Sequence, residues 1–486
     1  MKYIIGIDQS TQGTKALVFG GEGNILYRAD VAHRQIVNEQ GWVSHDPEEI
    51  YRNVIRAVKM AVEGSEIPKG DIAAVGISNQ RETTVLWDQD GRPLHPAIVW
   101  QCSRAGYIAE RLKDSAELVY ERSGIPLSPY FPGAKMAWLM EHAAGGGRGA
   151  KLHFGTIDSW LLYRLTKNRV YKTDMSNASR TQLFNLRTLS WDTELCRLFG
   201  VPMEALPEVC HSDNCFGATD FEGFLDHEIP ILAMLGDSHG ALFGQGCHKS
   251  GMVKATYGTG SSVMMNIGEK FVRSGNGLAT SLAWGMEGRV SYVLEGNINY
   301  TGAVVTWLKE DLGIICSPGE TEALARQANP EDGCILVPAF TGLSAPYWRG
   351  DAKALLCGMS RTTGRAELVR AALDSIAYQV TDVLKAMEQD SGCELRELRT
   401  DGGPTRNAYL MQMQSDLANV RVSAAGQEEL SAMGAAYLAG LTGGIYRREA
   451  LFDGMEYRHY EPMAERSSRE AGYAAWKRAV AMACQY

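Results

Sequence analysis

Residues 3–19 read YIIGIDQSTQGTKALVF. Two short apolar runs flank a polar turn that contains Gly13, and this pattern predicts a β-hairpin. A glycine-containing turn at 20–24 and a further strand-like run at 25–32 extend the hairpin. The chain is therefore expected to open with an antiparallel meander.

A helix and another strand are predicted after this meander. Asp46 is a suitable N-cap, Pro47 suits the first helical position, and Glu49 has the spacing of a capping box. Apolar residues recur at helical spacing from 50 to 62, and residues 72–77 form a short strand-like run. Meander, helix and strand together indicate an α/β sheet with mixed strand directions.

The pattern of the opening returns in the second half of the chain. An apolar run at 229–235 leads to Asp237, and residues 252–267 predict a strand, a glycine turn and a second strand. This repetition indicates two related halves. A chain of 486 residues also exceeds the usual size of one hydrophobic core. The expected domains are therefore residues 1–247 and 248–486.

Composition narrows the class of partner. The net charge is −9, from 48 basic and 57 acidic residues, which argues against a nucleic acid or an anionic membrane as partner. No apolar run approaches the ~18 residues that a membrane span requires. The ten cysteines are scattered and none form a Cys-x-x-Cys pair, which is typical of reduced thiols in a cytoplasmic protein.

Polar turns that contain glycine connect the strands of both predicted hairpins. Thr11, Gln12 and Gly13 belong to the first turn, and residues 258–260 (Gly-Thr-Gly) form the second. Turns of this kind present backbone N–H groups as anion-binding concavities. Either turn alone is better explained as a plain hairpin connection. Their similar places in the two halves favour a nucleotide bound between the domains.

Polar side chains follow several predicted strands. Asp8 and Asp237 end strands, where carboxylates commonly point into the ligand crevice of an α/β sheet. An Asx-turn at Asp8 and a helix N-cap at Asp237 are equally good explanations. Arg81 and Glu82 could bind sugar hydroxyls, although an exposed ion pair is the stronger explanation from pattern alone. Gly403 follows a strand, where glycines would allow an adenine ring to lie against the backbone. A plain turn between a strand and a helix is the alternative explanation.

Five longer motifs occur in order along the chain: residues 76–84 (GISNQRETT), 173–181 (TDMSNASRT), 257–260 (YGTG), 337–348 (VPAFTGLSAPYW) and 434–440 (GAAYLAG). Through them the sequence resembles the FGGY carbohydrate kinases, most closely the glycerol kinases, over nearly its whole length. The resemblance implies the actin-like ATPase fold, with two ribonuclease-H-like α/β domains and mixed sheets around a central cleft. It also implies ATP-dependent phosphorylation of a hydroxyl of a small polyol or sugar, with ATP and Mg²⁺.

The resemblance assigns roles residue by residue. Asp237 matches the general base, and Asp8 matches the carboxylate linked to magnesium. The substrate-binding set implied by it is Arg81, Glu82, Trp100, Tyr130, Asp237, Ser238 and Ser262. The nucleotide-binding set is Thr11, Gln12, Gly13, Lys15, Thr259, Gly302, Thr306, Gly403 and Asn407.

Four of these positions depart from the family pattern. Ser238 and Ser262 stand where the glycerol kinases have a glutamine and a phenylalanine beside the substrate, and Lys15 and Thr306 replace an arginine and a glutamine near the nucleotide. The two serines remove bulk and add hydroxyls, which suits a longer substrate such as a tetritol or a pentulose. Refilling of the space by neighbouring side chains, with glycerol as the substrate, is an equally good hypothesis.

A function of another class also shares the implied fold, namely a non-catalytic nucleotide switch. Retention of Arg81, Glu82, Tyr130 and Asp237 argues against it, because a switch needs no sugar pocket. The family often forms dimers or tetramers, so a homo-oligomer is compatible with the sequence, although no interface signal stands out.

Overall fold

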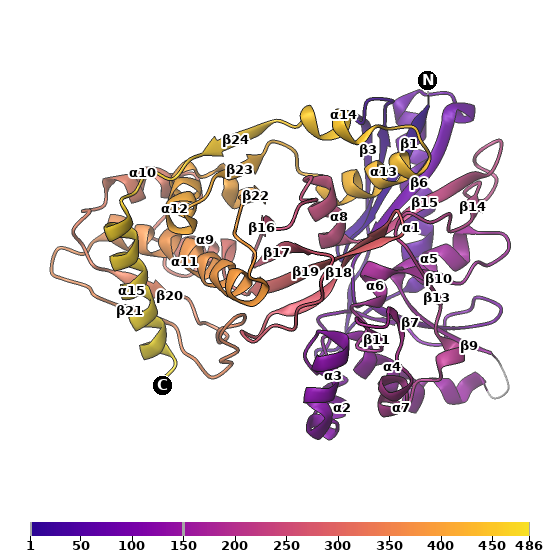
Figure 1. Ribbon diagram of the computed structural model, residues 1–486, viewed down its shortest axis with the longest axis horizontal. Helices are drawn as coiled ribbons and strands as arrows, with labels where there is room; N and C mark the ends of the chain where they lie inside the picture. Colours follow the sequence, from indigo (N-terminus) through magenta and orange to yellow (C-terminus); the bar gives the residue numbers. More distant parts are fainter. Residues whose placement is uncertain (1, 148–150, 486) are drawn as a thin grey trace.

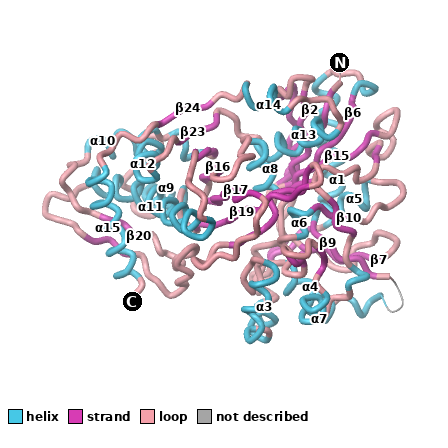
Figure 2. Tube along the Cα trace, viewed as in Figure 1, coloured by secondary structure: helices cyan, strands magenta, loops and turns pink. Residues whose placement is uncertain are grey.

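Two mixed β-sheets organise the structure, one in each half of the sequence (Figure 1). The computed structural model describes residues 2–147 and 151–485. Helices flank the strands of both sheets in the view of Figure 2. The α/β class predicted from the sequence is confirmed.

The N-terminal sheet has the strand order β14-β15-β6-β1-β2-β3. Its strands are β1 (Tyr3–Gln9), β2 (Gly13–Phe19), β3 (Ile25–Ala32), β6 (Ile72–Asn79), β14 (Ala218–Thr219) and β15 (Ile229–Gly236). The first three form the predicted antiparallel meander, and β6 and β15 run parallel to β1. The opening hairpin and the strand that begins at Ile72 are thus confirmed.

Helix α1 (Pro47–Ser65) covers β2 and β3. Asp46 is its N-cap and accepts a hydrogen bond from the Glu48 N–H at 2.9 Å, as the sequence predicts. The buried stripe that includes Ile50, Val54 and Val58 packs on the meander, because these side chains recur on one helical face.

The C-terminal sheet has a similar arrangement with an additional edge strand, β18, in the order β18-β19-β17-β16-β22-β23-β24. Its strands are β16 (Met252–Tyr257), β17 (Ser261–Gly268), β18 (Ala279–Met286), β19 (Arg289–Ile298), β22 (Glu397–Asp401), β23 (Val422–Ala425) and β24 (Tyr457–Tyr460). A meander of β16, β17 and β19 is again followed by two strands parallel to β16 and to each other. This repetition confirms the two related halves with mixed sheets.

Helices of the second half fall into two groups. Those associated with the C-terminal sheet are α9 (Gly302–Glu310), α10 (Glu320–Gln327), α11 (Arg365–Ser391), α12 (Ala408–Ala418) and α15 (Arg466–Ala483). Helix α13 (Leu430–Thr442) instead packs on β1, β6 and β15 of the N-terminal sheet and against α8 (Asp237–Gly244) (Figure 1). Helix α13 therefore belongs to the second half by sequence but packs on the sheet of the first half.

Smaller elements complete the fold. A five-stranded sheet contains β4 (Ile36–Val37), β5 (Val43–His45), β7 (Thr84–Asp88), β8 (Ala97–Ile98) and β9 (Leu152–Thr156). The remaining short strands are β10 (Lys172–Asp174), β11 (Phe184–Asn185), β12 (Ser190–Trp191), β13 (Glu208–Cys210), β20 (Ile335–Val337) and β21 (Leu355–Cys357). The remaining helices are α2 (Gly106–Arg111), α3 (Ala116–Ser123), α4 (Pro132–His142), α5 (Ile157–Leu165), α6 (Met175–Ala178), α7 (Thr193–Phe199) and α14 (Arg448–Asp453). None of the helices in the described ranges combines the length and apolar character needed to traverse a membrane.

Candidate active site

Three strands of the N-terminal sheet bring polar residues to one edge. In the parallel register Asp8 of β1 lies beside Ser78 of β6, and Gly236 of β15 lies beside Asn79. Parallel strands end at the same edge of a sheet, so Asp8, the residues that follow Asn79 and Asp237 are placed near one another. The register therefore brings these predicted positions to the same edge of the sheet.

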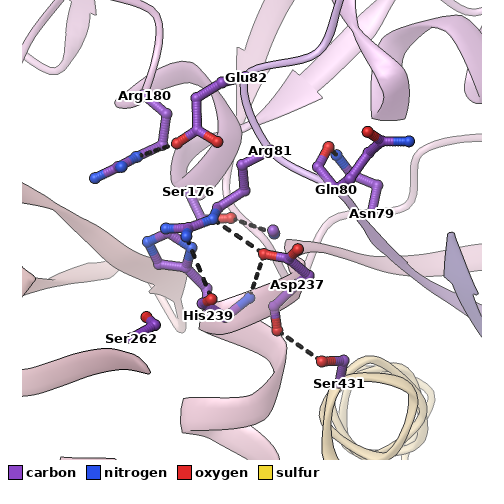
Figure 3. A network of polar contacts seen from close by, with 12 residues as sticks. Asn79, Gln80, Arg81, Glu82, Ser176, Arg180, Asp237, His239, Ser262 and Ser431 are labelled. Carbon is purple, nitrogen blue, oxygen red and sulfur yellow. Dashed lines mark hydrogen bonds and ion pairs between the residues drawn. The ribbon is translucent and has the colours of Figure 1, made fainter. Parts of the chain in front are cut away.

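Asp237 is the first residue of α8. Its Oδ1 accepts hydrogen bonds from Arg81 Nε at 3.0 Å and from the Ser238 N–H at 2.6 Å (Figure 3). The side chain of Asp237 is 35% exposed, whereas that of Arg81 is 6% exposed. The N-cap explanation of Asp237 is wrong, because the capping position is Gly236. The carboxylate is thus held from one side and accessible from another.

Asp8 is a buried carboxylate. Ser78 Oγ donates to its Oδ1 at 3.3 Å. Desolvation raises the pKa of Asp8 to about 7, with a further increase from the charge of Asp237, while the ammonium of Lys15 lowers it. The charge of Lys15 does not offset the burial and the charge of Asp237, so a cation beside this carboxylate would favour its ionised form, and a carboxylate oxygen is the ligand type that Mg²⁺ prefers. Residues 2–147 and 151–485 contain no group of three or more acidic, histidine or cysteine side chains that could hold a metal ion by themselves.

Arg81 and Glu82 are buried, with 6% and 2% of their side chains exposed. Glu82 adopts a left-handed backbone conformation (φ 60°) directly after Arg81. Arg180 Nε donates to Glu82 Oε1 at 2.6 Å, while Arg81 pairs with Asp237 (Figure 3). The explanation of residues 81 and 82 as an exposed ion pair is therefore wrong, because both side chains are buried and each contacts a different partner.

Glu295 on β19 and Arg180 after α6 join this network, and neither was assigned to the site from the sequence. Arg81 Nη1 and Nη2 donate to Glu295 Oε2 and Oε1 at 3.0 and 2.9 Å. Arg180 Nη1 lies 2.7 Å from Glu295 Oε2. Two features of the sequence could have indicated these residues. Glu295 is a single carboxylate in the apolar run YVLEG (292–296), and Arg180 lies inside the 173–181 motif.

An aromatic wall lies beside the first hairpin turn. Trp100 Nε1 donates to Thr11 Oγ1 at 2.9 Å, and the rings of Trp100 and Tyr130 have centroids 5.4 Å apart. Burial raises the pKa of the Tyr130 phenol, with a further increase from the charge of Glu82. Lys135 Nζ donates to the Pro129 carbonyl at 2.6 Å and also to that of Tyr130. These contacts connect the turn to two members of the predicted substrate set.

The two serines that depart from the family pattern are bound to the charged network. Arg81 Nη2 donates to Ser238 Oγ at 3.2 Å, and Ser262 Oγ donates to Glu295 Oε1 at 3.3 Å. The neighbouring His239 is fully buried, and its Nε2 lies 3.3 Å from Ser281 Oγ. The hydroxyls of Ser238 and Ser262 therefore have protein partners.

The predicted nucleotide residues of the first half surround the β1–β2 turn. The Ser10 N–H donates to the Gly13 carbonyl at 2.8 Å, and Gln12 is exposed at the tip. Lys15, cross-strand from Asp8, donates through Nζ to Glu429 Oε2 at 2.9 Å. Glu429 directly precedes α13, so this lysine is paired with a residue far away in the sequence.

The predicted nucleotide residues of the second half form a connected group. The Ala303 N–H donates to the Thr259 carbonyl at 3.0 Å, and the Gly302 N–H donates to the Gly258 carbonyl at 2.9 Å. A Cβ at Gly302 would lie 2.5 Å from the Gly258 oxygen, which explains why a glycine stands there. Farther along, Asn407 caps α12, and Thr306 is exposed on α9. These residues lie together around the β16–β17 turn and the N-termini of α9 and α12.

Comparison with known proteins identifies the family. The description "FGGY family of carbohydrate kinases, N-terminal domain" matches residues 3–244, and the corresponding C-terminal domain matches residues 253–442. The chain belongs to the FGGY family of carbohydrate kinases. It is thus an ATP-dependent carbohydrate kinase with the two-domain fold of that family.

Individual relatives agree with this assignment. Glycerol kinase 1 of Thermotoga maritima is 46% identical and covers 98% of this chain and 99% of its own length. The crystal structure of Plasmodium falciparum glycerol kinase with ADP superposes with a TM-score of 0.93 at 33% identity, covering 99% of this chain and 98% of the other. A xylulose kinase from Lactobacillus acidophilus (TM-score 0.88, 21% identity, 100% of this chain and 97% of the other) shares the fold. Similarity of this extent to kinases does not favour the non-catalytic switch.

Proposed function

We propose that this FGGY kinase transfers the γ-phosphoryl group of ATP to a terminal hydroxyl of glycerol, with Asp237 as the general base. The observation that carries the proposal is the accessible Asp237 carboxylate, held by the buried Arg81 at the start of α8. The full-length relatives named glycerol kinases, at 42–46% identity, support glycerol as the substrate.

The proposed mechanism follows from these positions. Phosphoryl transfer passes through a loose transition state, so orientation and charge neutralisation dominate catalysis. Asp237 accepts the proton of the attacking hydroxyl. Arg81 and Glu82 offer a donor and an acceptor to the other hydroxyls, and Trp100 and Tyr130 form an apolar wall against the carbon skeleton. The substrate is thereby oriented for in-line attack.

The nucleotide is assigned to the two turns and their neighbours. Thr11, Gln12, Gly13 and Lys15 would contact the phosphates from the N-terminal half, and Thr259 would do so from the C-terminal half. Gly302, Thr306, Gly403 and Asn407 would border the adenosine. A bound Mg²⁺ would neutralise phosphate charge, and Asp8 is the residue proposed to hold it, together with oxygens of the nucleotide and water.

The two serines do not by themselves require a tetritol or a pentulose. Ser238 Oγ accepts a hydrogen bond from Arg81 and Ser262 Oγ donates one to Glu295, so both hydroxyls already have partners in the charged network. Each hydroxyl nevertheless keeps a further hydrogen-bonding site. The choice of glycerol over a longer substrate is therefore based on the relatives named glycerol kinases.

The scattered cysteines, all ten of them free thiols, support a cytoplasmic location.

A substrate panel tests the proposal. ADP release is measured with polyols and ketoses of three to six carbons, at fixed Mg-ATP. We expect the highest kcat/KM with glycerol. A clear preference for a tetritol or a pentulose would replace glycerol by the larger substrate, and an absence of stimulation by every compound would favour the nucleotide switch.

A further inference from the structure

Glu295 is a buried carboxylate of the C-terminal sheet that lies between two arginines of the N-terminal half. Arg81 binds both of its oxygens, at 2.9 and 3.0 Å, and Arg180 Nη1 lies 2.7 Å from one of them. The side chains of Glu295 and Arg180 are each 1% exposed. Bidentate contacts of this kind fix orientation as well as distance.

Each arginine also holds a second carboxylate. Arg81 Nε donates to Asp237 at 3.0 Å, and Arg180 Nε donates to Glu82 at 2.6 Å (Figure 3). Negative and positive charges therefore alternate from Asp237 through Arg81, Glu295 and Arg180 to Glu82. The two ends of this charged row are the carboxylates that the proposed function assigns to the substrate.

The two arginines in this row are held together by the negative charge of Glu295, which lies between them. Desolvation would raise the pKa of Glu295, but the guanidinium groups of Arg180 and Arg81 outweigh it and hold the pKa well below its usual range. A neutral side chain at this place would leave two buried arginines that repel each other. Each would then be drawn more strongly toward its remaining carboxylate, because buried cations require compensation.

We propose that Glu295 is a positioning residue, which sets the separation and orientation of the Asp237 and Glu82 carboxylates by holding Arg81 and Arg180 between them. Glu295 belongs to β19 of the second half, whereas its partners belong to the first. The polyol site of the N-terminal half is therefore completed by a side chain of the other sheet. This role rests on the proposed function, because it concerns the polyol-binding groups of that reaction.

The test compares the effect of a substitution on the KM for glycerol with its effect on the KM for ATP. In Glu295→Gln we expect the KM for glycerol to rise at least tenfold and kcat to fall at least tenfold, with the KM for ATP within twofold of the parent chain. Glu295→Asp retains the charge with a shorter reach, and it should recover part of both losses. A purely structural defect would change the two KM values together.

Asp382→Asn is the matched control. Asp382 is also a buried carboxylate of the C-terminal half, and it accepts hydrogen bonds from Tyr347 Oη and Trp476 Nε1, both at 2.7 Å, among residues outside the proposed site. It reports the general cost of losing a buried carboxylate. We expect both of its KM values to stay within twofold of the parent, with any loss confined to thermal stability.

Arg180→Lys gives a second route if Glu295→Gln does not fold. A lysine keeps the charge but has a single ammonium in place of the guanidinium, whose Nε binds Glu82 while Nη1 forms an ion pair with Glu295, so the same selective rise in the glycerol KM is expected. Parent-like glycerol kinetics in the folded variants would overturn the role, as would glycerol and ATP KM values that rise together. A parent chain that releases no ADP with any polyol would overturn the proposed function itself, and the positioning role with it.

Discussion

Two carboxylates at one edge of the N-terminal sheet have different surroundings. Asp8 is buried, and desolvation followed by the charge of Asp237 raises its pKa to about 7. Asp237 keeps 35% of its side chain exposed and is bound by Arg81. A carboxylate that must receive a proton from a substrate hydroxyl has to be reachable, whereas a cation ligand can be buried. The environments therefore favour Asp237 as the base and Asp8 as the cation ligand.

Asp237→Asn tests this division of roles. The amide can still accept a hydrogen bond from Arg81, but it cannot accept the proton of the attacking hydroxyl. We expect kcat to fall about 10²–10⁴-fold, while the dissociation constant of ADP, measured by calorimetry, stays unchanged. Turnover equal to that of the parent would remove Asp237 from the catalytic step.

Lys135 binds the backbone of the segment that carries Tyr130. Its buried ammonium donates to the carbonyls of Pro129 and Tyr130, and desolvation lowers its pKa to about 7, although the charge of Glu82 opposes that shift. Lys135→Met keeps a similar volume and removes both donors. We expect the glycerol KM to rise at least about threefold because the Tyr130 segment loses its anchor. The ATP KM provides the internal control, and an unchanged glycerol KM would show that packing alone holds Tyr130.

At the scale of elements, the contact between α8 and α13 determines where Asp237 lies. Gly240 and Gly244 of α8 face Ser431, Leu430 and Gly434 of α13, with backbone atoms in close contact. Ser431 Oγ donates to the Asp237 carbonyl at 2.9 Å (Figure 3). Small residues permit this approach, so the first turn of α8 is fixed by a helix almost 200 residues later.

Gly434→Ala tests this helix contact. A Cβ at Gly434 would lie 1.9 Å from the Gly240 carbonyl oxygen, so the helices would have to separate. We expect a loss of about 2 kcal/mol or more in stability from overpacking, despite the better helix propensity of alanine. Gly106→Ala in α2, where a Cβ would meet nothing within 4 Å, is the control and should leave the melting temperature nearly unchanged. Equal melting temperatures of the two variants would contradict the close packing.

At the scale of the whole molecule, an aromatic cluster lies where the two halves meet. The ring of His248 lies 4.5 Å from that of Phe243, 4.7 Å from Phe452 and 5.5 Å from Trp284, measured between centroids. Desolvation lowers the pKa of His248 to about 3, with the charge of Arg448 as the next cause. This aromatic cluster between the halves therefore favours the neutral form of the His248 imidazole.

The burial of His248 in this cluster predicts that the stability of the folded protein depends on pH. The unfolded chain binds a proton at His248 below the ordinary histidine pKa of 6.5, while the folded chain does so only near 3. Stability is therefore lost as the pH falls below 6.5, by up to about 2 kcal/mol at pH 5. His248→Phe should reduce the difference between melting temperatures at pH 7 and pH 5. An unchanged difference would place the acid sensitivity elsewhere.

Much of the fold was predictable because its signals are local. The β1–β2 hairpin, the Asp46 cap of α1 and the turn at 258–260 depend on neighbouring residues, whose periodicity and turn chemistry are printed in the sequence. The same reasoning placed Asp8 and Asp237 at strand ends. It misjudged Arg81 and Glu82, because burial of a polar pair depends on partners such as Glu295, which lies 214 residues from Arg81.

The sequence by itself determined the first meander, the strand that begins at Ile72, the hairpin of β16 and β17 and, through its motifs, the kinase family. Only the tertiary structure decided that α13 packs on the first sheet, that Glu429 pairs with Lys15 over 414 residues, and that Glu295 binds two arginines of the other half. Hydrogen-bonding patterns within an element are fixed by nearby residues. Ion pairs and helix contacts between halves depend instead on which faces meet after folding, and no local pattern encodes that meeting.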